Sequence, residues 1–173
     1  IKGLDLLIDI LALLKSRLEF KLFVCGDGKE RLRLQKRINA MGLDSNVRFF
    51  NWLSPCLLKE KYTAMDILLI TSYREAGPRV AFEAMANGTP VVSTDVGVLS
   101  ELISNWIDGV IIRTRDPNEF AENIIALATN RNLLRIMGEK ARIKVKRSCD
   151  WNFLIGEYAK SYMKALHERT VVN

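Results

Sequence analysis

The spacing of hydrophobic and polar residues alternates along the chain between a helical period and short apolar runs. Leucines and isoleucines recur every three or four residues from Leu4 to Leu18, as on the buried face of an amphipathic helix. By this criterion and by turn signals, the predicted helices are residues 4–18, 29–41, 55–64, 78–87, 99–103, 117–130, 132–147 and 151–167. The predicted strands are residues 21–25, 47–50, 66–71, 90–93 and 110–112.

Strands and helices alternate in this prediction. The run at 66–71 (DILLIT) has a continuous apolar centre, which indicates burial on both faces, as in a parallel sheet. The order predicts an α/β fold, with a Rossmann-like, mostly parallel sheet flanked by helices and right-handed crossovers. No internal repeat or linker interrupts the 173 residues, a length typical of one domain, so we expect residues 1–173 to form a single domain.

The composition is that of an ordinary globular chain with a basic surface. Hydrophobic residues make up 49% and charged residues 27%, and no apolar stretch approaches the roughly 20 residues of a membrane span. The net charge of +6 favours partners that carry phosphate, namely a nucleotide, nucleic acid or an anionic membrane. The three cysteines are widely spaced and lack a metal-binding pattern, which indicates reduced, structural thiols in a cytoplasmic protein.

A run of basic residues is concentrated in the predicted helix 132–147. The favoured interpretation is a solvated helix face. The alternative is a peripheral contact with a membrane surface, which would place the protein at the inner face of the membrane. The run consists of Arg135, Lys140, Arg142, Lys144, Lys146 and Arg147.

Loops that follow strands are where open α/β sheets bind ligands, and four of them carry suggestive residues, although the last, residues 93–101, shows only turn signals and a helix start. Gly26 and Gly28 follow the strand 21–25; two glycines let a backbone approach a phosphate, although a plain strand-to-helix turn is the favoured interpretation. Trp52, after the strand 47–50, could stack on a base, although a structural role capping the core is slightly favoured. In either case a bound base is expected near the backbone of Asn51, Trp52 and Leu53.

A pair of glutamates follows the buried strand 66–71. Seven residues separate Glu75 from Glu83, and the intervening Gly77-Pro78 places Glu75 in a loop and Glu83 on the next helix. Free N–H groups at the start of that helix suit a diphosphate, a carboxylate on the helix suits the two hydroxyls of a ribose, and a carboxylate in the loop suits sugar hydroxyls. Taken alone, two ordinary exposed glutamates are an equally good interpretation.

The segment around these glutamates, EAGPRVAFEAMANGTPVVSTDVGVLSELI, resembles the donor-site signature of retaining glycosyltransferases of the two-domain GT-B architecture, in the group 1 or family 4 class. Further segments match in order, namely IKGLDLLIDILALL, KLFVCGDG, NVRFFNWL, YTAMDILLITSYRE and the closing helices, so the resemblance covers nearly the whole chain. It implies the C-terminal, donor-binding domain of an enzyme of polysaccharide or glycolipid biosynthesis. Such an enzyme transfers a glycosyl unit from a nucleotide-diphosphate sugar, such as a UDP- or GDP-sugar, to a glycan, lipid or small-molecule hydroxyl with retention.

The resemblance also implies a role for each matching residue. Glu75 is expected to lie by the donor sugar, to help hold it and to serve as the catalytic residue, and Glu83 is expected to bind the ribose hydroxyls. Lys2 is expected to neutralise the diphosphate, with Arg79 as a weaker candidate for the same work. No metal or cofactor is implied. The donor-binding set comprises Lys2, Gly26, Gly28, Asn51, Trp52, Leu53, Glu75, Ala76, Gly77, Arg79, Val80 and Glu83, with the backbone N–H groups of Gly77, Arg79 and Val80 facing the sugar and the phosphates.

Parts of the family's architecture are expected to lie outside this sequence. The first strand of the donor domain, and the whole acceptor-binding N-terminal domain, would precede Ile1. We therefore expect the chain alone to bind a nucleotide weakly and to transfer sugar poorly or not at all, because one wall of the cleft cannot exclude water. Two departures bear on the sugar pocket: Val98 stands where the family often has a second glycine, and Gly77 where it often has a bulky residue.

Other functions were weighed on the same residues. A non-catalytic nucleotide-sugar-binding module or partner subunit would use the same site. A nucleotide-sugar epimerase of the same architecture would need residues outside this chain, and the spacing of the glutamates argues against it. The absence of G-x-G-x-x-G disfavours a nicotinamide-dependent oxidoreductase, and nucleic-acid binding, which we do not expect, has only the basic charge behind it.

Overall fold

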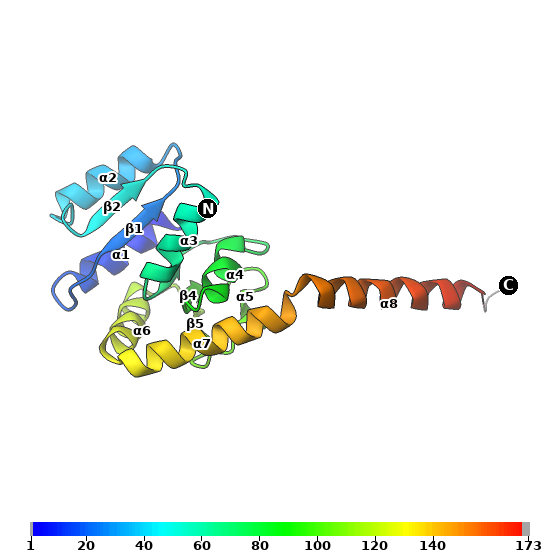
Figure 1. The fold of residues 1–173 in the computed structure, drawn as a ribbon. Coiled ribbons are helices and arrows are strands. Elements are labelled where there is room, and N and C mark those ends of the chain that lie inside the picture. The colour runs from blue at the N-terminus through cyan, green and yellow to red at the C-terminus, as the bar shows by residue number, and fades with distance from the viewer. Residues whose placement is uncertain (1, 171–173) are drawn as a thin grey trace.

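The computed structural model describes residues 2–170, with the side chains of residues 2–150, 152 and 154–167. Helices and strands alternate over this range as the sequence predicts (Figure 1). The helices are α1 Leu4–Leu14, α2 Arg31–Ala40, α3 Pro55–Ala64, α4 Arg79–Ala86, α5 Leu99–Leu102, α6 Pro117–Thr129, α7 Arg131–Ser148 and α8 Trp151–Thr170. The strands are β1 Leu22–Cys25, β2 Val47–Phe50, β3 Leu68–Ile70, β4 Val91–Thr94 and β5 Gly109–Ile112.

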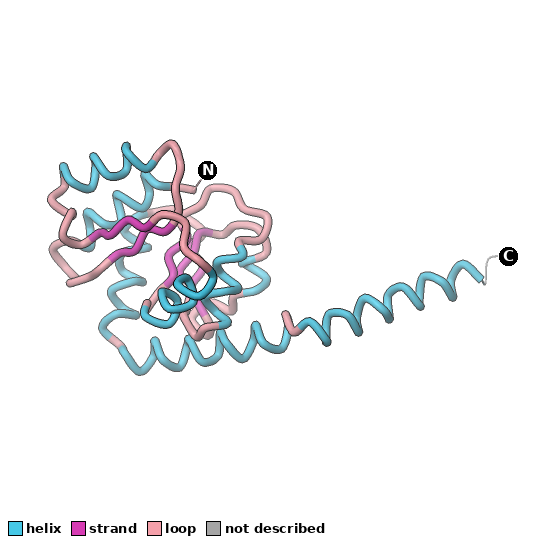
Figure 2. Tube along the Cα trace, turned by 45° about the horizontal axis from the view of Figure 1, so that its top comes forward, coloured by secondary structure: helices cyan, strands magenta, loops and turns pink. Residues whose placement is uncertain are grey.

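The strands form two parallel sheets in place of the single sheet that was expected. β1 pairs with β2, and β3, β4 and β5 are hydrogen-bonded in that order. The strands are drawn in magenta in Figure 2. Because β1 and β3 do not hydrogen-bond to each other, the sheet is divided between them. The α/β class and the parallel direction are confirmed, since a helical connection carries the chain from each strand to the start of its neighbour.

Helix α1 joins the two sheets into one core. Ile10 and Leu14 pack with the buried residues of β4, β5 and α6, whereas Ile8 and Leu11 pack with those of α2 and β2. Burying each of these side chains stabilises the fold by about 1.5–3 kcal/mol. The helix ends four residues before the predicted boundary. Leu18, in the segment that follows, still packs against the buried residues of β4, β5 and α6.

A close crossing of α4 and α7 fixes the orientation of α7. Gly138 of α7 lies against the backbone just after α4, where an added Cβ would be 2.0 Å from the carbonyl oxygen of Gly88. Ala141 and Val145, on the following turns of α7, are buried together with Met85 of α4. The opposite face of α7 is therefore turned to solvent.

Helix α8 extends away from the rest of the molecule (Figure 1). Its exposed side chains include five large apolar ones, those of Ile155, Tyr158, Tyr162, Met163 and Leu166. Over residues 2–170, no helix is both long enough and apolar enough to cross a membrane.

Some residues that the sequence assigns to the interior lie at the surface. The apolar pattern of the helix predicted at 29–41 includes Leu32, but this side chain is 72% exposed, and Leu34 and Ile38 alone are buried there. The three cysteines are free thiols, as expected. They are all exposed, however, so the prediction that they are structural is wrong.

Candidate functional site

The two glutamates lie beyond the carboxyl end of β3. Glu75 is in the loop after this strand and Glu83 is on α4, as the Gly77-Pro78 break predicts. Pro78 occupies the N-cap position of α4, one residue outside the predicted start, and no side chain caps the first N–H groups of the helix. The start of α4 therefore offers N–H donors that suit an anion.

Two donors hold Glu75 in place. Nζ of Lys2 donates to Oε1 of Glu75 at 2.5 Å, and Oγ of Ser72 donates to the same oxygen at 3.0 Å. The hydrogen bond from Lys2, supported by the one from Ser72, lowers the pKa of Glu75 against the opposing effect of burial. Oε2 accepts no hydrogen bond from any described side chain, so one carboxylate oxygen is left for a ligand.

Close backbone packing places Lys2 beside Glu75. The hydroxyl of Thr71, at the end of β3, donates to the carbonyl oxygen of Lys2 at 3.0 Å. Gly3 has a φ of 65°, and a Cβ added there would lie 1.7 Å from the carbonyl oxygen of Thr71. Only glycine fits this contact. It brings Lys2, which is expected to bind the diphosphate, next to Glu75, which is expected to bind the sugar.

Glu83 is anchored by a buried tyrosine that the sequence analysis did not single out. The hydroxyl of Tyr62 donates to Oε2 of Glu83 at 2.9 Å, and Nη2 of Arg79 lies 3.7 Å from Oε1. Burial raises the pKa of Tyr62, and the hydrogen bond to Glu83 raises it further, so the hydroxyl keeps its proton and remains a donor. The matching YTAMD segment was the signal that could have identified Tyr62.

The loop after β4 closes onto the loop that carries Glu75. Gly97 has a φ of 54°, and a Cβ added there would lie 2.1 Å from the carbonyl oxygen of Ala76. The N–H of Val98 donates to this same oxygen at 3.1 Å. Between the loops lies a cavity of about 580 Å³, within the range of small-molecule sites, and it is lined by Tyr73, Arg74, Glu75, Ala76, Asp95, Val96 and Gly97.

The glycine turn after β1 lies beside the end of β2. The N–H of Gly26 donates to the carbonyl oxygen of Phe50 at 3.1 Å. Arg31, which was not predicted as a site residue, donates to the carbonyl oxygens of both residues, at 3.0 Å and 3.2 Å. The turn at Gly26 and Gly28 and the loop at 51–53 therefore lie at the carboxyl end of one parallel strand pair, as expected for two parts of one pocket.

Trp52 does not cap the core. Its side chain is 82% exposed, so the structural role that was slightly favoured is wrong, and an aromatic face remains available to a ligand. Asn51 beside it is exposed and Leu53 is half-buried.

Acidic residues near the site do not gather as metal ligands do. Among the described residues, no group of three or more His, Cys, Asp or Glu side chains is placed to hold a metal ion. That a donor binds without a metal stays a prediction.

Comparisons with known sequences point to one family. The model of the family described as glycosyl transferases group 1 matches residues 1–144. A D-inositol 3-phosphate glycosyltransferase of Nocardia farcinica is 33% identical over 128 residues, which cover 74% of this chain and 28% of that protein. An uncharacterized glycosyltransferase of Methanocaldococcus jannaschii is 28% identical over 165 residues, or 95% of this chain and 42% of that protein. The chain thus spans less than half the length of these relatives.

Solved structures share the fold over nearly the whole chain. Sucrose-phosphate synthase from Thermosynechococcus elongatus superposes with a TM-score of 0.85 at 25% identity, over 96% of this chain and 43% of that one. HepE of Anabaena, in complex with UDP and glucose, has a TM-score of 0.82 at 24% identity, over 94% of this chain and 45% of that one. The C-terminal domain of LpcC, a glycosyl transferase group 1 family protein of Francisella tularensis, has a TM-score of 0.77 at 21% identity, over 87% and 80%.

Proposed function

Because the chain belongs to the group 1 glycosyl transferases, we propose that the surface carrying Glu75 and Glu83 binds the nucleotide-diphosphate sugar from which a glycosyl unit is transferred. The single observation that carries this proposal is how the two carboxylates are held. Glu75 receives both of its hydrogen bonds on Oε1 and keeps Oε2 for a ligand. Glu83 is anchored through Oε2 by Tyr62, and Oε1 has only a 3.7 Å ion pair with exposed Arg79.

The chemistry of each group fits one part of such a donor. Glu83 on α4 can accept hydrogen bonds from the two hydroxyls of a ribose, because each carboxylate oxygen has two lone pairs. The uncapped N–H groups at Gly77, Arg79 and Val80 suit the diphosphate. Lys2 carries three N–H donors, so it can reach a phosphate oxygen while it still donates to Glu75.

The base is proposed to lie over the ends of β1 and β2. Exposed Trp52 offers a face for stacking, and the backbone of Asn51 and Leu53 offers hydrogen-bonding groups for a base. Gly26 and Gly28 leave room for the nucleotide backbone, since an added Cβ at either would meet nothing within 4 Å. The UDP in the HepE structure favours a UDP-sugar as the donor, with a GDP-sugar as the alternative.

Transfer itself requires an acceptor, proposed to be a hydroxyl of a glycan, lipid or small molecule. We propose that Glu75 serves the reaction by holding the sugar in the geometry of transfer, with retention of configuration and without a metal. The acceptor side is proposed to come from a further domain, since this chain spans 28% and 42% of two of its relatives. The same limited coverage supports the alternative, a module that binds a nucleotide sugar without catalysis.

Nuclear magnetic resonance titration tests donor binding directly. The chain is titrated with UDP, GDP, ADP and the corresponding sugars, in the presence of a chelator. We expect weak, saturable chemical-shift changes at Lys2, Glu75 and Glu83 with one class of nucleotide. The control variant is Glu19→Gln, which should bind the nucleotide with unchanged affinity, because Glu19 is exposed and precedes β1, at the end of this strand opposite to Gly26. The donor-site proposal is wrong if no nucleotide perturbs these three residues.

A second experiment separates the enzyme from the binding module. The chain is mixed with, or fused to, an N-terminal domain of a group 1 relative, and transfer to candidate acceptors is followed with the nucleotide sugar that binds. Transfer that appears only in the combined protein, and is lost in Glu75→Gln, supports the enzyme. Binding without transfer in every combination supports the module.

A further inference from the structure

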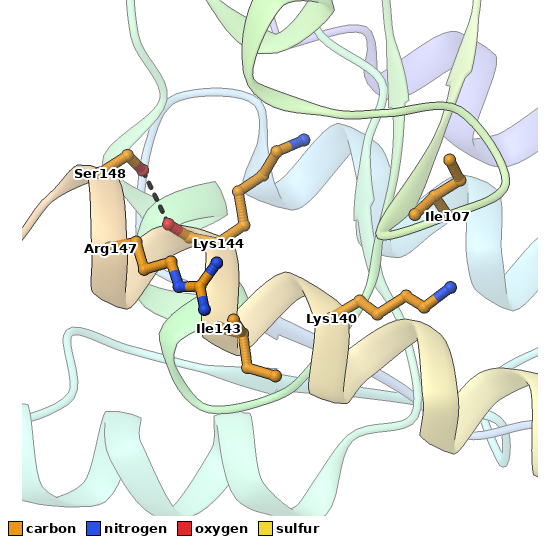
Figure 3. A pocket seen from close by; sticks show the side chains of 6 residues that line it. All are labelled: Ile107, Lys140, Ile143, Lys144, Arg147 and Ser148. Atoms are coloured by element: carbon orange, nitrogen blue, oxygen red, sulfur yellow. Dashed lines mark hydrogen bonds between the residues drawn. The ribbon is translucent and has the colours of Figure 1, made fainter.

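A second surface brings exposed apolar and basic side chains together between α7 and the loop 104–108. It contains a groove of about 480 Å³ lined by Ile107, Lys140, Ile143, Lys144, Arg147 and Ser148 (Figure 3). We call these residues, together with Trp106, the α7 patch. The loop 104–108 precedes β5, so it lies at the amino end of the parallel β3–β4–β5 sheet, whereas the loop of Glu75 lies at the carboxyl end.

The apolar side chains of the α7 patch face solvent, Ile143 from α7 and the other two from a loop held by its own hydrogen bonds. Ile107 is 50% exposed, Ile143 46% and Trp106 41%. The N–H of Trp106 donates to the carbonyl oxygen of Gly109 at 2.8 Å, and the loop adopts this shape although Trp106 takes a φ of 61°, which is uncommon for a bulky residue. Ile107 and Ile143 thus line one exposed groove, and exposed Trp106 precedes Ile107 in the chain.

Two of the three basic side chains of the α7 patch have no acidic partner among the described residues. Asp108, the acid of the loop, is 4% exposed and is neutralised by Lys144, whose Nζ lies 2.7 Å away. Glu139, the only acidic residue of α7, is already in an ion pair with another residue of the same helix. Lys140 and Arg147 form no ion pair with any acidic side chain in the described part of the chain, so their charge is available to an anionic partner.

We propose that the α7 patch docks the protein on a bilayer surface that contains anionic phospholipids. Lys140 and Arg147 supply the attraction to the headgroups, at roughly fivefold in affinity for each cation near such a surface. Trp106 and the two isoleucines enter the interface between headgroups and acyl chains, where tryptophan is enriched. Docking through the amino end of the sheet leaves the Glu75 loop open to solution.

The arrangement fits a membrane surface better than a small anion. Lys140 and Arg147 lie two helical turns apart, or about 10 Å, with Ile143 between them, so their donors do not converge on one point. A bilayer surface offers charged headgroups to both cations over that distance, and acyl chains to the isoleucine between them. This inference goes beyond donor binding and does not depend on it.

Vesicle flotation with charge-matched variants tests the proposal. The full chain is mixed with phosphatidylcholine vesicles that contain either half phosphatidylglycerol or none. The patch variant is Lys140→Glu with Arg147→Glu, and the control is Lys36→Glu with Arg48→Glu, at two exposed basic residues of α2 and β2. Each double change lowers the net charge by four, from +6 to +2. We expect binding to the anionic vesicles only, a loss of at least about tenfold in the patch variant, and a much smaller loss in the control.

A fluorescence experiment tests the apolar contact separately. Replacing the other two tryptophans (W52F and W151F) leaves Trp106 as the only one in the chain, and we expect its emission to shift to the blue on anionic vesicles. Ile107→Ser with Ile143→Ser should weaken vesicle binding by at least about threefold, because the apolar area that enters the interface is lost. Circular dichroism of every variant checks that the fold is retained.

Several outcomes would overturn the proposal. One is an equal loss of binding in the control and patch variants, which would indicate net charge alone. Another is binding that survives in the patch variant but is lost when Tyr158 and Tyr162 of α8 are changed to serine, which would place the contact on α8. A third is tight binding of duplex DNA, lost in the patch variant, with no binding to vesicles.

Discussion

The surface that carries Glu75 and Glu83, here called the donor face, and the α7 patch both carry exposed charge, but their charged groups are held very differently. At the donor face, Lys2 anchors Glu75 and Tyr62 anchors Glu83, each through one defined oxygen. At the α7 patch, Lys140 and Arg147 end flexible side chains with no described acidic partner. Side chains that are already held in place before binding lose little conformational entropy when a ligand binds, which favours a ligand of one fixed shape. Unfixed cations suit a fluid surface that imposes no geometry.

Backbone residues in the left-handed region also play different parts in the two surfaces. The loops of the donor face meet through Gly3 and Gly97, both in the left-handed region, where the missing Cβ allows carbonyl oxygens to approach. The left-handed residue of the α7 patch is Trp106, whose large side chain is turned to solvent. At one end of the sheet this conformation brings two loops together, and at the other it displays a side chain.

The largest effect is expected from Gly97→Ala, which should disrupt the donor face and spare the α7 patch. The new Cβ would lie 2.1 Å from the carbonyl oxygen of Ala76 and 2.6 Å from that of Glu75, at a φ of 54°. We expect the free energy of unfolding to fall by about 3 kcal/mol, since the loops must separate and the backbone remains strained. Urea unfolding measures this change, and nucleotide titration should show that donor binding is lost.

Gly28→Ala is the matched control for that experiment. It lies in a donor-side turn, but its φ is not in the left-handed region and an added Cβ meets nothing within 4 Å. We expect a change in unfolding free energy of less than about 1 kcal/mol. Similar losses in the two variants, or a loss of vesicle binding in folded Gly97→Ala, would contradict the comparison.

The next largest effect is expected from Glu83→Gln on nucleotide affinity. An amide is neutral and has one acceptor oxygen in place of two, so one ribose hydroxyl would lose its acceptor and the other would keep only a neutral one. Hydrogen bonds to charged groups contribute about 1.5–3 kcal/mol, which predicts a loss of about 10- to 100-fold in donor affinity by calorimetry. Vesicle binding should be unchanged. An unaltered nucleotide affinity would show that Glu83 is not the ribose ligand.

A smaller effect is expected from Tyr62→Phe, which removes the anchor of Glu83 and keeps the carboxylate. The lost hydrogen bond is to a charged group and leaves one carboxylate oxygen less fixed, so we expect about 1 kcal/mol less stability and a loss of about fivefold in nucleotide affinity. Unfolding and calorimetry are measured on the same sample. If Tyr62→Phe weakens donor binding as much as Glu83→Gln does, Tyr62 contacts the donor itself.

The sequence predicts the order of elements well because local patterns and tertiary packing agree. The helical spacing from Leu4 corresponds to the buried face of α1, and the apolar run at 66–71 corresponds to β3, in which Ile70 is buried and Leu68 and Leu69 are partly buried. The division into two sheets was not predicted, because strand pairing depends on neighbours distant in the chain. The positions of Leu32 and Trp52 were wrong because an apolar side chain carries no information on whether another element covers it.

The candidate site was predictable as a set of loops but not as a set of contacts. The Gly77-Pro78 break correctly separates Glu75 from α4. Tyr62 reaches Glu83 across 21 positions and Lys2 reaches Glu75 across 73, and no short spacing encodes such contacts. Whether these residues bind a donor stays a prediction.

The smallest effect concerns the pH dependence that the Lys2–Glu75 pair adds to stability. Lys2 lowers the pKa of Glu75, so the pair stabilises the fold above the ordinary glutamate pKa, and this contribution is lost as the pH falls through the lowered value. Unfolding free energies are compared between the unchanged chain and Glu75→Gln from pH 7 to pH 3. The difference should be largest near neutrality and shrink on acidification, while other carboxyls with lowered pKa values, such as Asp5 and Glu122, act equally in both proteins. At the α7 patch, Lys140→Gln should give a difference that does not vary over this range, because no described carboxylate is paired with Lys140. A flat difference for Glu75→Gln as well would mean that its contact with Lys2 is not maintained in solution, and the donor face would then be no more fixed than the patch.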